Sequence, residues 1–149
     1  MARKLYVLNG SNLNMLGLRE PELYGSATLE DVRADCERIA DELGYGLFFG
    51  QSNAEDQLID WLHDAFRQQA TVVINPAGFS YRSVPILDAL RMLTTPIVEV
   101  HITNIHARGT MYQHSLTSTV ANAVIAGAGV YGYELAIRAA DRLMGGAND

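Results

Sequence analysis

The sequence predicts an α/β protein with a flavodoxin-like fold, a three-layer sandwich in which a five-stranded parallel sheet of order 2-1-3-4-5 has helices on both faces. The main observation is an alternation along the chain, because short apolar runs are followed by segments whose apolar residues recur at helical spacing. This βα repeat is typical of parallel sheets covered by helices. A second observation is the length of 149 residues, which suits five such strands and a single domain spanning residues 1–149.

Five apolar runs are expected to form the strands. Their continuous apolar character is typical of parallel strands that are covered on both faces. The third run ends at Asn75 and Pro76, and the fourth runs into His101. The expected strands are residues 5–8, 47–49, 71–74, 97–100 and 120–125.

Capping residues indicate where helices begin and end. Thr28 and Asp31 form a capping pattern at the start of the first helix, and Gly44 suits the left-handed position after its end. Ser52 and Glu55 predict a second capping box. The apolar positions at helical spacing are Leu29, Val32, Cys36, Ile39, Ala40 and Leu43 in the first helix, Leu58, Ile59, Leu62, Ala65 and Phe66 in the second, Val84, Leu87, Leu90 and Leu93 in the third, and Leu135, Ala136, Ala139 and Leu143 in the last.

Composition argues against several classes of protein. The net charge of −6 disfavours a nucleic-acid binder, which usually has a basic excess. No apolar stretch approaches the roughly 18 residues that a membrane helix needs, and MARKLYVLNG lacks the apolar run of a secretory signal. Cys36 is the single cysteine, so no intrachain disulfide is possible, and its place in an apolar helical stripe indicates a core residue rather than a nucleophile. A cytoplasmic location fits these observations.

The predicted topology also predicts where a site should lie. In open α/β sheets, ligands bind outside the carboxyl ends of the strands, near the switch point between strands 1 and 3. Polar segments follow three of the expected strand ends, at residues 9–24, 75–83 and 101–114. We therefore expect these three segments to converge, although the first is also compatible with an ordinary polar connection.

Several motif-based chemistries find no support. There is no G-x-G-x-x-G after the first strand and no Walker A lysine, which disfavours the corresponding nucleotide sites. No G-x-S-x-G elbow is present, which disfavours an α/β-hydrolase. Metal-ligand residue types do occur, but Glu99 and His101, two residues apart on a strand, can share one face without ligating anything. We therefore expect no metal site, including at His106 and His114.

Acid–base chemistry fits the three segments better. His101 at a strand end can donate or accept a proton near neutral pH, and Glu99 on the same face can orient it. Tyr24 can act as a base if Arg19, five residues earlier, stabilises its phenolate. Two alternatives stay open. His101 could instead be hydrogen-bonded in the wall of the core, and Tyr24 could be an exposed aromatic residue of a loop.

Neutral hydrogen-bond donors follow the same strands. Asn12 and Asn75 suit the binding of an oxyanion or a carboxylate, although asparagine is equally favoured in turns and caps. The peptide N–H groups of Ile102 and Thr103, just beyond the fourth strand, can be presented to an anion.

Four blocks of the chain carry a family resemblance. They are NGSNLNMLGLREPELYG (residues 9–25), QSNAEDQLIDWLHDA (51–65), INPAGFS (74–80) and VEVHITNIHAR (98–108). The sequence resembles type II 3-dehydroquinate dehydratase, the small enzyme of the shikimate pathway, over nearly its whole length. Separate blocks in the right order are far more specific than any single short motif.

The resemblance implies an activity and a set of catalytic residues. The activity is that of a hydro-lyase, which removes water from 3-dehydroquinate to give 3-dehydroshikimate by anti elimination through an enolate. Tyr24 matches the base, and Arg19 matches the lid arginine that favours its phenolate. Asn12 matches the residue that helps to hold the enolate oxygen, partly through water. His101 matches the acid that protonates the leaving hydroxyl, with Glu99 as its support.

The resemblance also implies substrate anchoring and assembly. Asn75 and the backbone of Ile102 and Thr103 match the anchoring groups, and Asp88 matches a carboxylate near the substrate hydroxyls, contributed across a subunit contact. No metal or organic cofactor is implied. The implied partners are a small cyclic hydroxy-keto acid and further copies of the chain, in a homododecamer built as a tetramer of trimers. The implied role is in aromatic amino acid biosynthesis or in quinate catabolism.

Several positions depart from the family pattern. Tyr81 and Arg82 replace a usual histidine and threonine, and Tyr112 replaces a usual arginine. The other departures are Ser11, Gly109 and Thr110. The acid–base residues are retained, whereas the groups expected around the ring hydroxyls are changed, so we hypothesise intact catalysis with an altered substrate preference. The alternatives are a related lyase for a different β-hydroxy carbonyl acid and a non-catalytic binding homologue.

Overall fold

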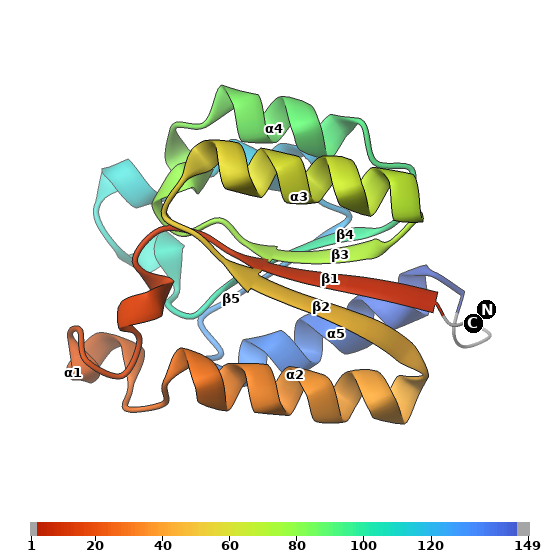
Figure 1. The fold of residues 1–149 in the computed structure, drawn as a ribbon. Coiled ribbons are helices and arrows are strands. Elements are labelled where there is room, and N and C mark those ends of the chain that lie inside the picture. The colour runs from red at the N-terminus through yellow and green to blue at the C-terminus, as the bar shows by residue number, and fades with distance from the viewer. Residues whose placement is uncertain (1–2, 146–149) are drawn as a thin grey trace.

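A parallel sheet forms the middle layer of the molecule (Figure 1). The computed structural model describes residues 3–145. The strands are β1 (Arg3–Asn9), β2 (Tyr45–Gln51), β3 (Thr71–Asn75), β4 (Ile97–His101) and β5 (Ala123–Ala126). They lie in the order β2-β1-β3-β4-β5, and each neighbouring pair is parallel, which confirms the predicted sheet.

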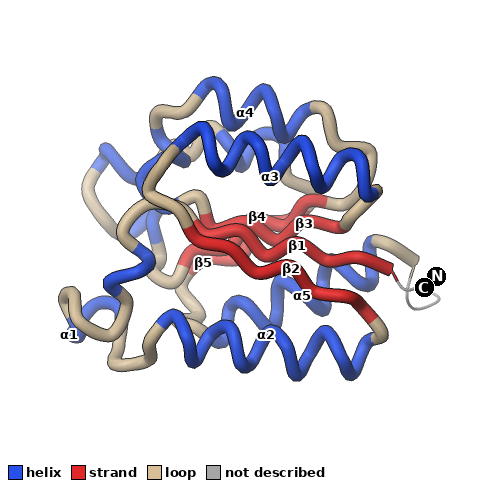
Figure 2. Tube along the Cα trace, in the orientation of Figure 1, coloured by secondary structure: helices blue, strands red, loops and turns tan. Residues whose placement is uncertain are grey.

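Helices cover both faces of this sheet, which confirms the predicted three layers (Figure 2). The helices are α1 (Pro21–Tyr24), α2 (Leu29–Leu43), α3 (Glu55–Gln68), α4 (Val84–Arg91) and α5 (Tyr131–Leu143). α2 and α5 cover one face, α3 and α4 cover the other, and α1 stands apart beyond the carboxyl ends of the strands (Figure 1). Within residues 3–145, no helix is long and apolar enough to cross a membrane.

Two hydrophobic cores lie on opposite faces of the sheet, because successive strand residues point to opposite sides. In β3, Val73 belongs to the core beneath α2 and α5, whereas Val72 and Ile74 belong to the core beneath α3 and α4. Cys36 is fully buried in the first of these cores, as predicted. Burial raises the pKa of its thiol to about 12, so this cysteine stays protonated and unreactive at neutral pH.

The first long helix begins and ends as the sequence predicts. The Thr28 hydroxyl accepts a hydrogen bond from the Asp31 N–H (3.1 Å), and the Asp31 carboxylate accepts one from the Thr28 N–H (2.9 Å). These two bonds complete a capping box at the start of α2. Gly44 follows α2 with a φ of 82°, the left-handed conformation that glycine adopts at little cost.

The predicted capping box at Ser52 and Glu55 is wrong. Glu55 is the first residue of α3, which places the N-cap at Ala54. The Ser52 hydroxyl accepts a hydrogen bond from the Ala54 N–H (2.9 Å), whereas the Glu55 carboxylate accepts one from the Ser83 hydroxyl (2.5 Å). Ser83 also caps α4 by accepting from the Ile86 N–H (3.0 Å). Glu55 therefore ties α3 to the start of α4.

The last strand begins later than the predicted residue 120. Val120 ends a 3-10 helix, η5 (Thr117–Val120), and β5 starts at Ala123. Asn122 explains the difference, because its side-chain oxygen accepts from the Ile97 N–H (2.8 Å) while its own N–H donates to the Ile97 carbonyl (2.7 Å). These bonds fix the chain beside β4 immediately before the strand pairing begins.

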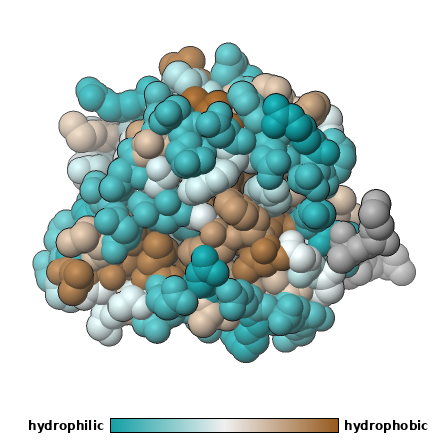
Figure 3. Space-filling model, viewed as in Figure 1, coloured by the Kyte–Doolittle hydropathy of each residue, from teal (hydrophilic) through white to brown (hydrophobic). Residues whose placement is uncertain are grey.

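The opposite edge of the sheet is only partly covered. Figure 3 shows hydrophobic residues gathered where β2 crosses the front of the molecule, between the two helical layers. Leu47, Phe48 and Phe49 of this edge strand are half-buried. The ring of Phe48 packs against Tyr6 and Trp61, with centroids 4.9 and 5.4 Å away. Aromatic contacts thus cover the face of β2 that lies toward α3.

Removing the cap of α2 should measurably destabilise the protein. We expect Thr28→Ala to lower the free energy of unfolding by about 1 kcal/mol, because the Asp31 N–H loses its acceptor. Urea denaturation would measure this loss. Ser26→Ala is the matched control, since Ser26 is exposed two residues earlier and its hydroxyl has no hydrogen-bond partner in the described part of the chain. Equal losses in the two variants would contradict the capping role.

Candidate active site

The three polar segments converge, as predicted, on a cavity at the carboxyl ends of β1, β3 and β4. The volume of this cavity is about 170 Å³. It is lined by Ser11, Asn12, Leu13, Arg19 and Tyr24 after β1, by Asn75, Ala77, Gly78 and Tyr81 after β3, and by His101, Ile102, Thr103, Ile105, Arg108 and Tyr112 at and after β4. The topology thus brings together most of the predicted site residues.

Two guanidinium groups flank the phenol of Tyr24. The Arg19 guanidinium carbon lies 4.5 Å from the centroid of the Tyr24 ring. Arg108 Nη1 donates a hydrogen bond to the Tyr24 hydroxyl oxygen over 3.2 Å. One guanidinium thus contacts the face of the tyrosine ring and the other its hydroxyl group. The sequence predicts Arg19 beside Tyr24 but not Arg108, although Arg108 ends one of the four resemblance blocks.

Tyr24 lies at the end of a short and exposed helix. None of the residues of α1 is buried, and Gly25 follows the helix with a φ of 82°. Pro21 occupies the first turn, where its lack of an N–H costs no hydrogen bond. Arg19 precedes the helix, and its guanidinium also pairs with the Glu20 carboxylate at 3.0 Å. The candidate base is therefore held by its two arginine contacts and by partial packing against the core.

Asn12 reaches the same cavity from a tight turn. Its backbone has a φ of 68°, in the left-handed region, so the turn role that the sequence left open is present. Its N–H donates to the Asn53 side-chain oxygen (2.8 Å), while its own side chain makes no capping hydrogen bond. The side-chain amide of Asn12 thus remains available to a ligand in the cavity.

His101 and Glu99 form a buried pair on β4. Nε2 of His101 lies 2.7 Å from a carboxylate oxygen of Glu99, and the two side chains are 4% and 1% exposed. Burial alone would raise the pKa of Glu99, but the hydrogen bond and charge of His101 and the hydroxyls of Ser118 and Thr117 outweigh it, so the pKa is lowered. Glu99 is therefore ionised at neutral pH, and Nε2 of His101 donates to it.

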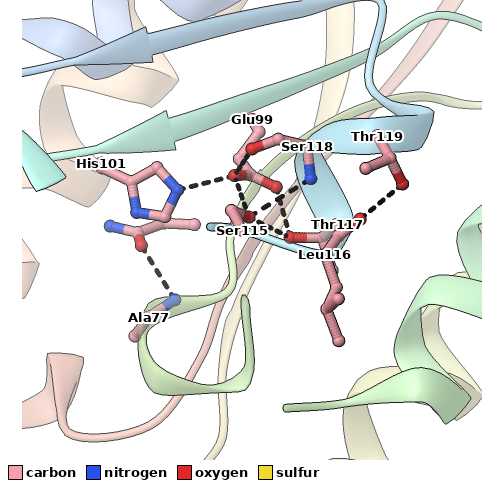
Figure 4. A network of polar contacts seen from close by, with 9 residues as sticks. Ala77, Glu99, His101, Ser115, Leu116, Thr117, Ser118 and Thr119 are labelled. Carbon is pink, nitrogen blue, oxygen red and sulfur yellow. Dashed lines mark hydrogen bonds and ion pairs between the residues drawn. The ribbon is translucent and has the colours of Figure 1, made fainter. Parts of the chain in front are cut away.

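Three hydroxyl groups absent from the sequence prediction complete this pair (Figure 4). Ser115 and Ser118 donate to the same carboxylate oxygen as His101, over 2.8 and 2.5 Å, and Thr117 donates to the other oxygen over 2.5 Å. They belong to the segment that leads back from the loop after β4 into β5. The run of serine and threonine at residues 115–119 was the available signal in the sequence.

Asn75 is positioned by a buried tyrosine of α5. Its side-chain nitrogen donates to the Tyr133 hydroxyl (2.9 Å), and that hydroxyl donates to the Asn9 side-chain oxygen (2.7 Å). The Asn75 oxygen accepts from the Ala77 N–H (3.1 Å), which is a turn role of the kind that the sequence left open. Since an amide nitrogen carries two protons, one donor of Asn75 remains for a ligand.

The peptide groups of Ile102 and Thr103 follow β4 at the cavity, and their presentation to an anion stays a prediction. Ile102 and Thr103 line the cavity, and among the described residues neither peptide N–H donates to another backbone carbonyl. The Ile102 carbonyl, in contrast, accepts from the Gly129 N–H (3.0 Å). Two adjacent free N–H groups beside the Asn75 amide form a neutral anion-binding arrangement.

Asp88 does not reach the cavity within one chain. It lies on α4 with a side chain that is 76% exposed, and it pairs with Arg91 at 3.9 Å. Its predicted contribution across a subunit contact stays a prediction. Arg82 does not line the cavity either. Within residues 3–145, no cluster of three His, Cys, Asp or Glu side chains is arranged to hold a metal ion.

An aromatic pair forms the wall of the cavity beside His101. The rings of Tyr81 and Tyr112 meet edge to face, with centroids 5.4 Å apart at 86°. Tyr81 lies alongside the His101 ring (6.5 Å, 29°), and the Arg108 guanidinium lies 4.2 Å from the centroid of Tyr112. Burial raises the pKa of Tyr81 to about 12 against the opposing charge of Arg108, so this phenol is neutral.

The site is an acid–base arrangement at the switch point of a flavodoxin-like α/β protein. A phenol between two guanidinium groups shares one cavity with a histidine that is backed by an ionised carboxylate. The sequence profile of the family described as dehydroquinase class II matches residues 3–141. The chain therefore belongs to the class II (type II) dehydroquinase family.

Individual relatives agree with this assignment. The chain is 54% identical to 3-dehydroquinate dehydratase 2 of Agrobacterium fabrum over 132 residues, which are 89% of this chain and 90% of the relative. It is 49% identical to 3-dehydroquinate dehydratase of Phenylobacterium zucineum over 140 residues, 94% of this chain and 97% of the relative. The crystal structure of type II dehydroquinase from Propionibacterium acnes superposes with a TM-score of 0.89 at 42% identity, covering 93% of this chain and 95% of that one.

Removing the hydroxyl of Tyr133 should affect both stability and the site. We expect Tyr133→Phe to lower the free energy of unfolding by roughly 1–3 kcal/mol, because the buried amides of Asn9 and Asn75 lose a shared partner. Urea denaturation measures the loss. Tyr131→Phe is the matched control on the same helix, since Tyr131 is 57% exposed. A Tyr133→Phe protein as stable as this control would exclude the positioning role of the hydroxyl.

Proposed function

We propose that this chain is a hydro-lyase that converts 3-dehydroquinate into 3-dehydroshikimate and water, by anti elimination through an enolate. The observation that carries the proposal is that Tyr24, with its two guanidinium groups, lines the same cavity as His101, which is paired with the buried Glu99. A base and an acid on different strand-end loops can act on two neighbouring carbon atoms of one bound ring. Membership of the dehydroquinase family supports the same activity.

The first step is removal of a proton from the carbon between the ketone and the hydroxyl-bearing carbon. The phenolate of Tyr24, stabilised by Arg19 and Arg108, takes this proton. The electron pair moves onto the ketone oxygen, and the neutral amide of Asn12 is the group that stabilises this enolate oxygen, in part through water. A neutral donor serves here because it leaves the adjacent positive charges to the phenolate.

The second step is loss of the hydroxyl group as water. His101 supplies the proton from the ring nitrogen that does not face Glu99, and the ionised Glu99 stabilises the imidazolium before the transfer. The enolate then collapses to the ketone with a new carbon–carbon double bond. After one turnover Tyr24 holds one proton more and His101 one proton fewer than at the start. Exchange with solvent removes the proton from Tyr24 and returns one to His101.

The substrate carboxylate is anchored by neutral groups. The free N–H groups of Ile102 and Thr103 and the remaining amide proton of Asn75 suit its oxygens. Asp88 of a neighbouring subunit would contact the ring hydroxyls. This role for Asp88 belongs with a homododecamer, a tetramer of trimers, in which one subunit completes the site of another.

The wider setting of the activity follows from the same proposal. Residues 1–149 act as a single catalytic domain in the cytoplasm, and the chemistry uses acid–base groups of the chain without a metal or organic cofactor. The dehydration serves the shikimate route to aromatic amino acids or the catabolism of quinate, since both require this step. The retained pairing of Tyr24 with Arg108 and of His101 with Glu99 disfavours a non-catalytic binding homologue.

Ultraviolet absorbance tests the activity directly, because the product gains a conjugated enone. We expect the wild-type protein to produce this absorbance from 3-dehydroquinate and Tyr24→Phe to lower kcat by about 10²–10⁴-fold, the usual contribution of a positioned base. Tyr131→Phe, which removes an exposed phenol, is the control. A folded wild-type protein without activity would exclude the proposed function, and an active Tyr24→Phe protein would exclude Tyr24 as the base.

The aromatic pair favours a second candidate, a related lyase for a less hydroxylated β-hydroxy carbonyl acid. Tyr81 and Tyr112 present flat apolar surface beside His101, at the place where the family resemblance places a histidine and an arginine. Each substrate hydroxyl left without its hydrogen-bond partner costs about 1–3 kcal/mol, or roughly ten- to a hundredfold in affinity. The acid–base steps are the same for either substrate.

A substrate panel and a double variant separate the two candidates. We expect Tyr81→His with Tyr112→Arg to lower the KM for 3-dehydroquinate about tenfold, because two hydrogen-bonding groups for the ring hydroxyls become available. The matched measurement uses an analogue ring acid that lacks those hydroxyls, for which the KM should rise. An unchanged KM for both substrates would contradict a role for this aromatic pair in substrate preference.

A further inference from the structure

The carboxylate of Glu99 is surrounded by more donors than its pairing with His101 requires. Ser115 and Ser118 donate to Oε2, which also receives the His101 hydrogen bond, and Thr117 donates to Oε1. Figure 4 shows these hydroxyls on the side of Glu99 away from the His101 ring. Ser115 is fixed in turn by the Ser118 N–H, which donates to its oxygen over 3.2 Å. We name Ser115, Thr117 and Ser118 the hydroxyl cradle.

The protons of this cluster can be counted. Each hydroxyl carries one proton and lies within hydrogen-bond distance of the carboxylate, and the Ser115 and Thr117 oxygens also lie 3.1 Å from each other. With the Nε2 proton of His101, four donors meet a carboxylate that has about four lone-pair positions. Three of these donors meet Oε2 and one meets Oε1, and each of these hydrogen bonds is stronger to an ionised carboxylate than to the neutral acid.

These donors favour one arrangement of protons on His101. Because four hydrogen bonds hold Glu99 as an ionised acceptor, Nε2 of His101 keeps its proton in both charge states of the ring. Nδ1, on the side of the ring that does not face Glu99, is then the atom that exchanges a proton with the cavity (Figure 4). Which ring nitrogen of a histidine is protonated is generally set by the hydrogen bond that the other nitrogen makes.

We propose that Ser115, Thr117 and Ser118 are positioning residues that hold Glu99 as an acceptor, so that His101 delivers its proton to the substrate from Nδ1. The inference rests on the proposed dehydration and adds residues that act through Glu99 without touching the substrate. Thr117 carries most weight because it is completely buried and, among the described residues, no other side chain donates to Oε1.

Thr117→Val is the sharpest variant, because valine keeps the shape of threonine and removes the hydroxyl. Thr71→Val is its matched control, since Thr71 is 1% exposed and its hydroxyl has no hydrogen-bond partner among the described residues. Thr71 lies at the start of β3, away from the carboxyl ends that form the cavity. Thr117→Ser restores the hydroxyl without the methyl group and therefore separates a polar role from packing.

Nitrogen-15 NMR of the histidine rings reads the proton positions without any substrate. At a pH where the His101 ring is neutral, the wild-type protein should show the proton on Nε2, and so should Thr71→Val and Thr117→Ser. Thr117→Val should show a mixture of the two tautomers, because a Glu99 that has lost a donor takes a proton from solvent and donates it to Nε2 of a ring protonated on Nδ1. A pure Nε2–H ring in Thr117→Val, or the same mixture in Thr117→Ser, would overturn the inference.

Steady-state kinetics on the oligomeric protein provide the second measurement. We expect Thr117→Val to lower kcat about tenfold with KM unchanged, as for the loss of one buried hydrogen bond to a charged group. Thr117→Ser should recover most of kcat, and a failure to recover would overturn the inference in favour of a packing role. If Thr117→Val does not fold, Ser118→Ala takes its place in both measurements. An inactive wild-type protein would refute the dehydration alone, because the NMR result would still decide the proton positions.

Discussion

The buried negative charge of Glu99 is the constraint on which the rest of the site depends. A carboxylate with a 1% exposed side chain is expensive to bury unless its oxygens are fully hydrogen-bonded. His101 on the same strand supplies one bond, and the segment returning toward β5 supplies three more. The chain between β4 and β5 must therefore pass beside Glu99, so that its three hydroxyl groups can donate to the buried carboxylate.

A second polar network joins the layers at the switch point. The Tyr133 hydroxyl bridges Asn9 at the end of β1 and Asn75 at the end of β3, although it comes from α5. Because strand pairing aligns Asn9 with Asn75, the tyrosine fixes two side chains that already lie side by side. The helix layer therefore determines which donor of Asn75 faces the cavity, and packing and recognition share the same hydroxyl.

Local patterns predicted the elements better than the contacts between them. Apolar runs and the Thr28 box predicted the sheet and α2, because these depend on neighbours in sequence. Ser52 and Glu55 failed as a box because Glu55 accepts from Ser83, which is 28 residues away. The start of β5 failed because Asn122 bonds to Ile97 before the ladder begins. Sequence spacing carries no information on such distant partners.

The candidate site follows the same rule. Tyr24, Arg19, His101 and Asn75 could be named because each lies on a strand-end loop that topology directs to one place. The hydroxyl cradle could not be named, since its role appears only when the return segment is packed against Glu99. Asp88 differs from these residues, because it lies exposed on α4 and outside the cavity of its own chain. Its predicted role depends on a second chain.

The short helix that carries Tyr24 gives the two candidate catalytic residues, Tyr24 and His101, different mechanical properties. His101 belongs to a central strand and a buried polar network, so moving it would require opening the core. Tyr24 belongs to α1, which has no fully buried residue, and the tyrosine packs partly against the core and contacts two arginines. Local opening of such a segment costs far less than global unfolding. His101 is thus fixed when the chain folds, whereas opening of α1 would move Tyr24 without loosening the sheet.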